Sequence, residues 1–554
     1  MKKITLFLVA TLFSALSFAA LNPYAYGLSS TLEGTTLTVN YSLNSAATGV
    51  SVVILDGAEE VKTVTCDGIT KGSHSVDIST LDLPTGKSLT WKVVVKGTSV
   101  AKPTLQSDLT LKYCLPRGIG VDRSTESPYF GRIYTTDATG GAAYHASEGK
   151  GLYVFDAGLT PVTSSTGGKK FTGGITFGSD DISRVVVSDD GRVFLSRFNT
   201  TGSPVFEINP ANLNESFTPV FTSITGSAIG IDIKGAGENL QLVMLSKTSR
   251  VITEYDLKTA SQWTSSSPSR TYTKQDLTTE KVLSLVTDNA YISYDLNDGV
   301  WLTQHRATAT TTEPTIAHVI PSGVDYNNYN EGLSHNNTSN GGVAVSPDGK
   351  QLAVVGAGER TLTIYSISND GSGNISLTQK HKIYHASDIG KNHTALEWDY
   401  AGNLYVANRS AETITFYAMP YSGTVSTPCA SKYAFEVEEI VANVYTLTTN
   451  VVGEGTIEGN DGSYVEGTTA TLTATPAEHY DFLNWNYGSE TSTDNPLTIT
   501  VDGDKNVTAN FATLTKGAYT VNVAYDGVNY TYAITVLEVA ATTWTNPVTE
   551  VVLN

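Results

Sequence analysis

The sequence is poor in charged residues, cysteine and methionine. Only 16% of its 554 residues are charged, and it has three cysteines and three methionines. Cys66, Cys114 and Cys429 allow at most one disulfide and leave one thiol over. No two of them form a CxxC motif, so a zinc ribbon and a dithiol redox site are both excluded. After the first 20 residues no apolar run reaches the ~20 residues that a membrane-spanning helix needs.

Basic residues are also scarce. The chain has 35 Lys and Arg against 54 Asp and Glu, a net charge of −19. This balance argues against nucleic acid and anionic lipid as partners. The sequence contains no GxSxG, HExxH, P-loop or strand-linked GxGxxG motif. It therefore predicts no cofactor and leaves the presence of a metal open.

Residues 1–20 have the pattern of a signal peptide. Lys2 and Lys3 precede an apolar stretch, and small residues including Ala19 and Ala20 offer cleavage sites. The alternative, a membrane anchor, normally has a longer apolar run and a stop-transfer pattern after it. We expect an exported protein, located in the periplasm, at the cell surface or outside the cell.

The remaining sequence is rich in Gly, Thr, Ser, Asn and Tyr, a composition typical of all-β proteins. In VSPDGKQLAVVG (345–356), two short apolar runs flank a turn, which predicts a β-hairpin. The same pattern, an apolar run, a turn with glycine and a second apolar run, occurs at six places including this one. The turn glycines are 46 to 62 residues apart. Those glycines are Gly131, Gly191, Gly237, Gly299, Gly349 and Gly402.

A repeat near 50 residues with three or four short strands predicts a β-propeller over 113–430. One blade cannot bury both of its faces, whereas a closed ring of blades can. We predict six blades, or seven if residues 305–340 hold another. The alternative is a tandem of β-sandwiches, whose strands would recur less evenly.

Alternating strands predict an immunoglobulin-like sandwich over 27–112, before the propeller. After the propeller, residues 445–512 form a small β module and 514–554 a β-rich segment. The predicted fold class is all-β throughout.

Three stretches resemble known families. The SPDG-type hairpins resemble secreted bacterial propellers of the NHL and lactonase kind, and 27–112 resembles the immunoglobulin-like fold of flagellar hook caps. YTLTTNVVGEGTIEG, GSYVEGTTATLTATPAEHYDFLNW and NPLTITVDGDKNVTANFA resemble the divergent internalin-type B repeat. That last resemblance implies a turn at Gly467 and Thr468 and a small core containing Trp485 and Phe511. It also implies a stalk or presenting module and no catalysis.

In a propeller, the residues that follow each second strand gather at one end of the ring, opposite the SPDG-type turns. The candidate ligand-binding residues are therefore Asp137, Arg197, Lys247, His305, Arg306, Arg360, Asn408 and Arg409, with His335 and His393 from blade-linking segments. Guanidinium groups suit carboxylates and planar polar groups. A glycan that contains uronic or sialic acid would fit this lining, and nearby Tyr rings could stack on sugars.

The leading functional hypothesis is an exported binding protein whose propeller recognises a polysaccharide or a surface protein. One alternative is a hydrolase, lyase or lactonase acting on a glycan or a lactone. A purely structural or adhesin role is another.

Cys114 and Cys429 bracket the propeller, whose first and last strands must meet to close the ring. The sequence therefore predicts a disulfide between Cys114 and Cys429, which an exported compartment would permit. Cys66 would be the odd thiol, buried as a small apolar residue. The alternative is that all three thiols are free and buried.

Overall fold

The computed structural model describes an all-β chain in which the described residues form no α-helix. The described residues are 20–106, 109–112, 115–138, 149–178, 181–198, 202–247, 251–265, 267–272, 290–295, 299–304, 316–320, 323–325, 340–356, 360–369, 375–384, 394–409, 411–427, 433–438, 443–459, 461–513, 517–525 and 527–536. None of these residues forms a helix with the length and hydropathy of a membrane span. The chain divides into two units, residues 1–437 and 438–554.

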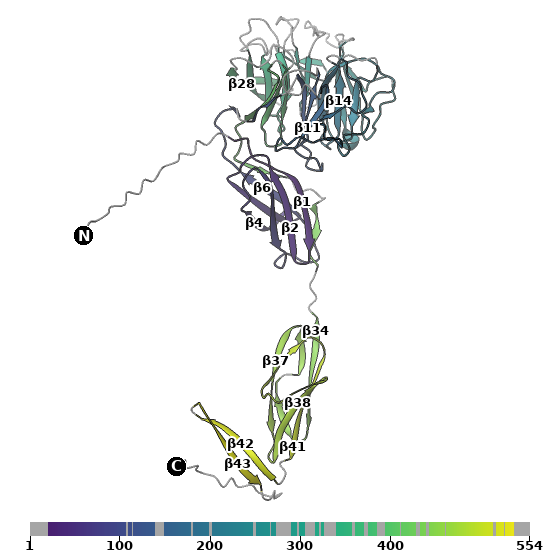
Figure 1. The fold of residues 1–554 in the computed structure, drawn as a ribbon. Coiled ribbons are helices and arrows are strands. Elements are labelled where there is room, and N and C mark those ends of the chain that lie inside the picture. Colours follow the sequence, from purple (N-terminus) through teal and green to yellow (C-terminus); the bar gives the residue numbers. More distant parts are fainter. Residues whose placement is uncertain are drawn as a thin grey trace, which may run out of the picture. The chain divides into compact units, whose positions relative to one another are not determined.

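Six antiparallel sheets, five of four strands and one of five, form the propeller in the first unit (Figure 1). The first three blades are β9 to β12 (Pro116–Val121, Ile133–Asp137, Gly151–Phe155, Lys170–Phe171), β13 to β16 (Ile182–Val187, Val193–Arg197, Val205–Ile208, Thr218–Pro219) and β17 to β20 (Ala228–Lys234, Gln241–Ser246, Ile252–Asp256, Arg270–Tyr272). The next are β21 to β24 (Ala290–Tyr294, Val300–Gln304, Ile316–Ile320, Gly323–Asp325) and β25 to β28 (Asn340–Val345, Gln351–Gly356, Thr361–Asn369, Ile375–Tyr384). The sixth blade contains β29 to β31 (Thr394–Trp398, Leu404–Asn408, Thr413–Ala418).

The ring is closed by strands from the beginning of the propeller sequence. β7 (Thr104–Leu105) and β8 (Leu111–Lys112) pair with β31 and so complete the sixth blade. Each innermost strand packs against the innermost strands of both neighbouring blades, including β29 against β9. The prediction of a closed propeller with six blades is thus confirmed. β23 and β24, in the stretch considered for a seventh blade, belong to the fourth.

The residue that follows an inner strand accepts a hydrogen bond that supports the turn into the second strand. In the turn that first suggested the fold, Ser346 Oγ accepts the Gln351 N–H at 2.9 Å, and Gly349 has a φ of +69°. In the sixth blade, Asp399 Oδ1 accepts the Asn403 N–H at 2.8 Å. These side chains accept hydrogen bonds from backbone N–H groups that have no partner in the strand ladder at the short turn.

Two sheets form the immunoglobulin-like sandwich. One contains β1 (Ala25–Glu33), β2 (Thr36–Leu43) and β5 (Gly72–Ser79), and the other contains β3 (Gly49–Asp56), β4 (Glu59–Cys66) and β6 (Ser88–Lys96). Two further strands, β32 (Thr424–Ser426) and β33 (Phe435–Glu436), pair with β6. The propeller is therefore inserted between strands of the sandwich. The predicted ranges 27–112 and 113–430 differ from this arrangement because each part takes strands from the other's range.

The core of the sandwich depends on the segment that returns from the propeller. Trp91 is fully buried, its ring centroid lies 4.6 Å from that of Tyr433, and its Nε1–H donates to Ser30 Oγ at 3.0 Å. Val437 belongs to the same apolar cluster. Cys66 is a buried free thiol of this core, as predicted.

The sandwich and the propeller make direct contact through the residues before β1. Asn22 N–H donates to Asn403 Oδ1 at 2.7 Å, and Asn22 Nδ2 donates to Ala401 O at 3.1 Å. The Tyr24 and Phe130 rings meet edge to face, with centroids 5.8 Å apart. The propeller residues in these contacts belong to first-to-second strand turns, so the sandwich packs at that end of the ring.

The second unit contains the B-repeat module and a hairpin. The module has the strands β34 (Val444–Val452), β35 (Gly455–Glu458), β36 (Gly462–Val465), β37 (Thr468–Pro476), β38 (Tyr480–Tyr487), β39 (Glu490–Ser492), β40 (Leu497–Val501) and β41 (Lys505–Thr513). Trp485 and Phe511 lie in its core, and Gly467 precedes β37 with a φ of +81°, as the resemblance implied. β42 (Gly517–Tyr525) and β43 (Val528–Val536) form a two-stranded hairpin in the predicted β-rich segment.

Candidate functional site at the centre of the propeller

The propeller has two ends, which the strand register distinguishes. At the hairpin end lie the first-to-second strand turns, and the sandwich packs there. At the loop end the innermost strands begin and the second strands finish, since Asp137 pairs with Pro116 and Asn408 with Thr394. The predicted ligand-binding residues that the structure describes belong to this loop end.

Several of these predicted residues already have partners within the protein. The Arg197 guanidinium forms an ion pair with Asp181, donating to both carboxylate oxygens. Asn408 is buried, and its Oδ1 accepts the Ala411 N–H at 3.2 Å. Asp137 is fully buried. These three side chains thus have structural contacts, and a ligand role for them stays a prediction.

The other described candidates are Lys247, Arg360 and Arg409. Lys247 Nζ lies 4.0 Å from the ring centroid of Phe198. Arg360, just before β27, has a φ of +58°. Arg409 follows β30 directly and is partly buried. The predicted residues His305, Arg306, His335 and His393, and the predicted Cys114–Cys429 disulfide, lie outside the described residues.

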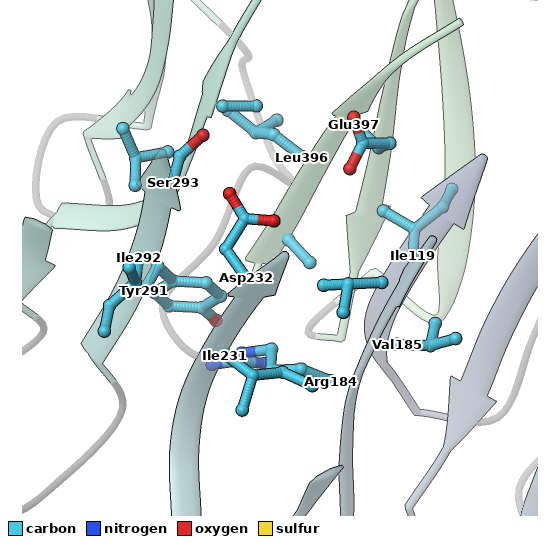
Figure 2. A pocket seen from close by; sticks show the side chains of 14 residues that line it. Ile119, Arg184, Val185, Ile231, Asp232, Tyr291, Ile292, Ser293, Leu396 and Glu397 are labelled. Atoms are coloured by element: carbon cyan, nitrogen blue, oxygen red, sulfur yellow. The ribbon is translucent and has the colours of Figure 1, made fainter. Parts of the chain in front are cut away.

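A narrow cavity of about 40 Å³ lies on the axis of the ring (Figure 2). It is lined by Ile119, Arg184, Val185, Val186, Ile231, Asp232, Tyr291, Ile292, Ser293, Val343, Ala344, Ala395, Leu396 and Glu397, all from innermost strands. A water molecule requires about 10–15 Å³ of such space, so the cavity admits a few waters and no sugar ring.

Arg184 of β13 is a buried cation that lines this channel. Its guanidinium donates through Nη1 to Arg117 O and packs over the Tyr291 ring, with Cζ 3.7 Å from the ring centroid. The side chain is buried, and Nε–H has no acceptor among the described residues. Burial lowers the pKa of Arg184, and the neighbouring Tyr291 hydroxyl opposes that change.

Other arginines of the propeller show what Arg184 is missing. Four of them pair with carboxylates: Arg123 with Glu397, Arg192 with Glu207, Arg197 with Asp181 and Arg270 with Glu254. Arg184 has no such partner in the part of the chain that the structure describes. A buried charge that lacks its counter-ion is unfavourable by about 3–5 kcal/mol. An acid group bound from outside would supply the missing partner.

Tyr291 is the point where several guanidinium groups converge. Burial raises the pKa of the Tyr291 hydroxyl, while the charges of Arg184, Arg117 and Arg409 lower it. Arg117 begins the first blade and Arg409 follows the second strand of the sixth. Three guanidinium groups thus lie near the Tyr291 hydroxyl, although the whole chain is acidic.

An acidic layer lies deeper, toward the hairpin end. Burial raises the pKa of Asp232 to about 7, with a smaller contribution from the charge of Glu397. Two backbone N–H groups, of Ile233 and Tyr294, donate to the Asp232 carboxylate. Burial also raises the pKa of Glu397, against the attraction of Arg123, whose Nη1 lies 2.7 Å from Glu397 Oε1.

Close strand packing fixes Arg184 in the channel. A Cβ atom at Gly118 would lie 2.6 Å from Ser183 O and 2.8 Å from Arg184 Cα. At Gly120 it would lie 2.8 Å from Val185 O. The GIG sequence of β9 therefore lets the first two inner strands approach without side chains between them.

Sequence reasoning missed Arg117, Asp232, Tyr291 and Glu397. The signal was a charged residue inside an otherwise apolar inner strand, as in ISRVVV (182–187), IGIDIK (229–234) and ALEWD (395–399). Such a residue cannot face the packed blades at low energetic cost, so it faces the axis.

A second, larger hollow of about 510 Å³ lies at the hairpin end. Its lining includes Asp348, Tyr400, Tyr421 and Ser426. Tyr400 OH donates to Ser426 O at 2.9 Å, and Asp348 Oδ1 accepts from Ser346 Oγ at 2.6 Å. No arginine or lysine lines this hollow, so it lacks the basic character of the loop end.

Two family profiles match parts of the chain. Residues 445–515 match the divergent InlB B-repeat domain, and residues 281–452 match the Lipoprotein LpqB beta-propeller domain. These matches confirm the propeller and B-repeat resemblances at the level of the domain. The finer resemblance to NHL and lactonase propellers, and that of 27–112 to hook-cap domains, stay predictions.

Solved structures that are similar to this chain share little sequence with it. An auxiliary nutrient binding protein from Bacteroides ovatus ATCC 8483 is 10% identical, with a TM-score of 0.34 over 70% of this chain and 95% of that one. The periplasmic gluconolactonase PpgL of Pseudomonas aeruginosa is 13% identical, with a TM-score of 0.33 over 70% and 96%. No curated protein matches the chain.

Proposed function

We propose that the protein is an exported binding protein whose propeller recognises an acidic polysaccharide at its loop end. The observation that carries this proposal is Arg184, a buried guanidinium at the channel with no carboxylate partner among the described residues. Arg117 and Arg409 add positive charge around the same Tyr291 ring. A carboxylate of a uronic acid or a sialic acid would pair with the Arg184 Nε–H edge.

Binding accounts for the site better than glycan hydrolysis. A hydrolase needs two carboxyl groups on either side of a scissile bond. Asp232 and Glu397 are two carboxyl groups of the channel, but the cavity beside them has a volume of only about 40 Å³. A whole sugar ring does not fit in that space, which disfavours a glycosidic bond between these two carboxyl groups. In this proposal the Asp232 and Glu397 carboxyl groups contribute to the electrostatic potential below the bound acid group.

The other parts of the chain support presentation at the outside of a cell. The first 20 residues have the features of an export signal. The B-repeat module contains a core of its own around Trp485, which suits a spacer between the propeller and its point of attachment. The sandwich packs at the hairpin end and makes its described contacts there, so the loop end is the face proposed for the ligand.

A glycan array with the full-length protein tests this function. We expect retention on glycans that contain uronic or sialic acid and none on their neutral counterparts. Arg184→Gln should lose that retention, whereas Arg192→Gln, which removes an arginine paired with Glu207 near the hairpin end, should keep it. Binding to neutral glycans alone, or equal retention by both variants, would contradict the proposal.

A further inference from the structure

Two buried proton donors line the channel and have no acceptor among the described residues. One is the Arg184 Nε–H group. The other is the hydroxyl of Tyr291, which lines the same cavity and is only 4% exposed. Arg184 can donate to the Tyr291 oxygen but cannot accept its proton, because a guanidinium group has no acceptor atom. The Tyr291 O–H proton therefore lacks an acceptor in the part of the chain that the structure describes.

The two donor side chains lie against each other. Arg184 Cζ is 3.7 Å from the centroid of the Tyr291 ring, so the guanidinium group packs on that ring (Figure 2). Arg184 comes from β13 of the second blade and Tyr291 from β21 of the fourth. Burial raises the pKa of the Tyr291 hydroxyl by more than the neighbouring guanidinium groups lower it. The hydroxyl therefore keeps its proton at neutral pH and acts as a donor.

The rest of the cavity lining limits what these donors can bind. Its other ionisable groups are the Asp232 and Glu397 carboxyls, which are hydrogen-bond acceptors when ionised. A second acid group deeper in the channel would meet these carboxyls instead of donors. The space of about 40 Å³ is also too small for a sugar ring. The lining thus suits one acid group that projects from a ring.

We propose that Tyr291 is a second ligand-binding residue, whose hydroxyl donates to one oxygen of a ligand carboxylate while Arg184 Nε–H donates to the other. This inference rests on the proposed function and adds a specificity-determining residue to it. A carboxylate suits the two donors, because it carries two acceptor oxygens on one carbon. The recognised unit is therefore a single carboxylate, and one uronic acid is sufficient for binding.

Calorimetric titration of the full-length protein with galacturonic acid, its linear trimer and neutral galactose tests the inference. We expect both acids to bind and galactose not to bind. Tyr291→Phe keeps the ring on which Arg184 packs and removes only the hydroxyl. It should weaken the binding of galacturonic acid about tenfold to a hundredfold, since a hydrogen bond to a charged group is lost. Arg184→Gln should weaken the binding of both acids.

The melting temperature of the ligand-free variants separates a binding role from a structural one. Tyr291→Phe removes a buried hydroxyl that has no acceptor, so the melting temperature should stay the same or rise. Tyr405→Phe is the matched control, because Tyr405 is also buried but its hydroxyl donates to Asp399 Oδ2 at 2.8 Å. This control should lower the melting temperature and leave the affinity for galacturonic acid unchanged.

The possible failures are distinguishable. Unchanged affinity of Tyr291→Phe for galacturonic acid would overturn the inference and leave the proposed function standing. A fall in its melting temperature as large as that of Tyr405→Phe would make the hydroxyl a structural group and would also overturn the inference. Binding of the trimer without binding of the monomer would overturn recognition of a single carboxylate. Absence of binding by both acids would reject the proposed function itself.

Discussion

At the scale of single residues, the channel contains ionisable side chains within an otherwise apolar ring of inner strands. Asp232, Glu397 and Arg184 all come from innermost strands whose other residues pack against neighbouring blades. Burial shifts each group toward its neutral form, upward for the pKa of the two carboxyls and downward for the pKa of the guanidinium. The ion pair with Arg123 offsets the effect of burial on Glu397, and the proposed ligand would offset the effect of burial on Arg184.

Asp232 gives a pH dependence whose sign follows from its raised pKa. The folded protein holds a proton on Asp232 up to about pH 7, whereas the unfolded chain releases it near the ordinary value of 3.8. The contribution of Asp232 to stability should therefore be greatest below about pH 4 and fall as the pH rises from about 4 to about 7. One pKa unit corresponds to about 1.4 kcal/mol, so the loss is on the order of a few kcal/mol.

Chemical denaturation of the first unit between pH 4 and 8 measures this effect. Asp232→Asn should make the decline less steep, whatever its stability at pH 4, because the amide does not titrate. Asp399, whose pKa burial raises to about 6, still contributes in this variant. Asp494→Asn, an exposed carboxylate of the second unit, should leave the decline unchanged. A variant that declines as steeply as the natural protein would show that Asp232 is not the titrating group.

At the scale of strands and sheets, the sequence predicted the propeller well and the sandwich incompletely. Alternating runs and turn glycines are local signals, and β2 and β3 lie in the range predicted for the sandwich and β31 in that predicted for the propeller. The pairing of β32 and β33 with β6 joins residues more than 300 positions apart, and strands of two or three residues carry no periodicity. The same holds for β7, which sequence reasoning assigned to the sandwich range.

The interleaved strands predict which fragments can fold. Residues 27–112 alone lack β32, β33 and the Tyr433 ring that covers Trp91, so this fragment should fail to give a cooperative transition. Residues 20–438 contain every strand of both sheets and should unfold cooperatively. Thermal circular dichroism of the two fragments makes the comparison. A stable sandwich from 27–112 alone would contradict the interleaved arrangement.

At the scale of the whole molecule, the chain contains two units with separate cores. The first unit joins sandwich and propeller through side-chain contacts such as that of Asn22 with Asn403. The second has its own buried residues around Trp485. The B-repeat was predicted from the resemblance of a short continuous stretch to a known family, which residues 445–515 match. The charged channel depends instead on packing between blades that lie far apart in the chain.

Two separate cores predict two unfolding transitions in the full-length protein. Trp485→Ala should lower the stability of the B-repeat by about 3–5 kcal/mol, since it removes a fully buried aromatic side chain. The transition of the first unit should keep its midpoint. Differential scanning calorimetry resolves the two, and a shift of both by similar amounts would mean that the units unfold together.

The central claim is that an acid group of an external ligand pairs with Arg184 at the loop end of the propeller. A crystal structure of the full-length protein with linear trigalacturonate tests it most directly. The account predicts a carboxylate oxygen within about 3 Å of Arg184 Nε. Trimer density in the hollow beside Tyr400 at the hairpin end, with Arg184 still lacking a carboxylate, would contradict the account.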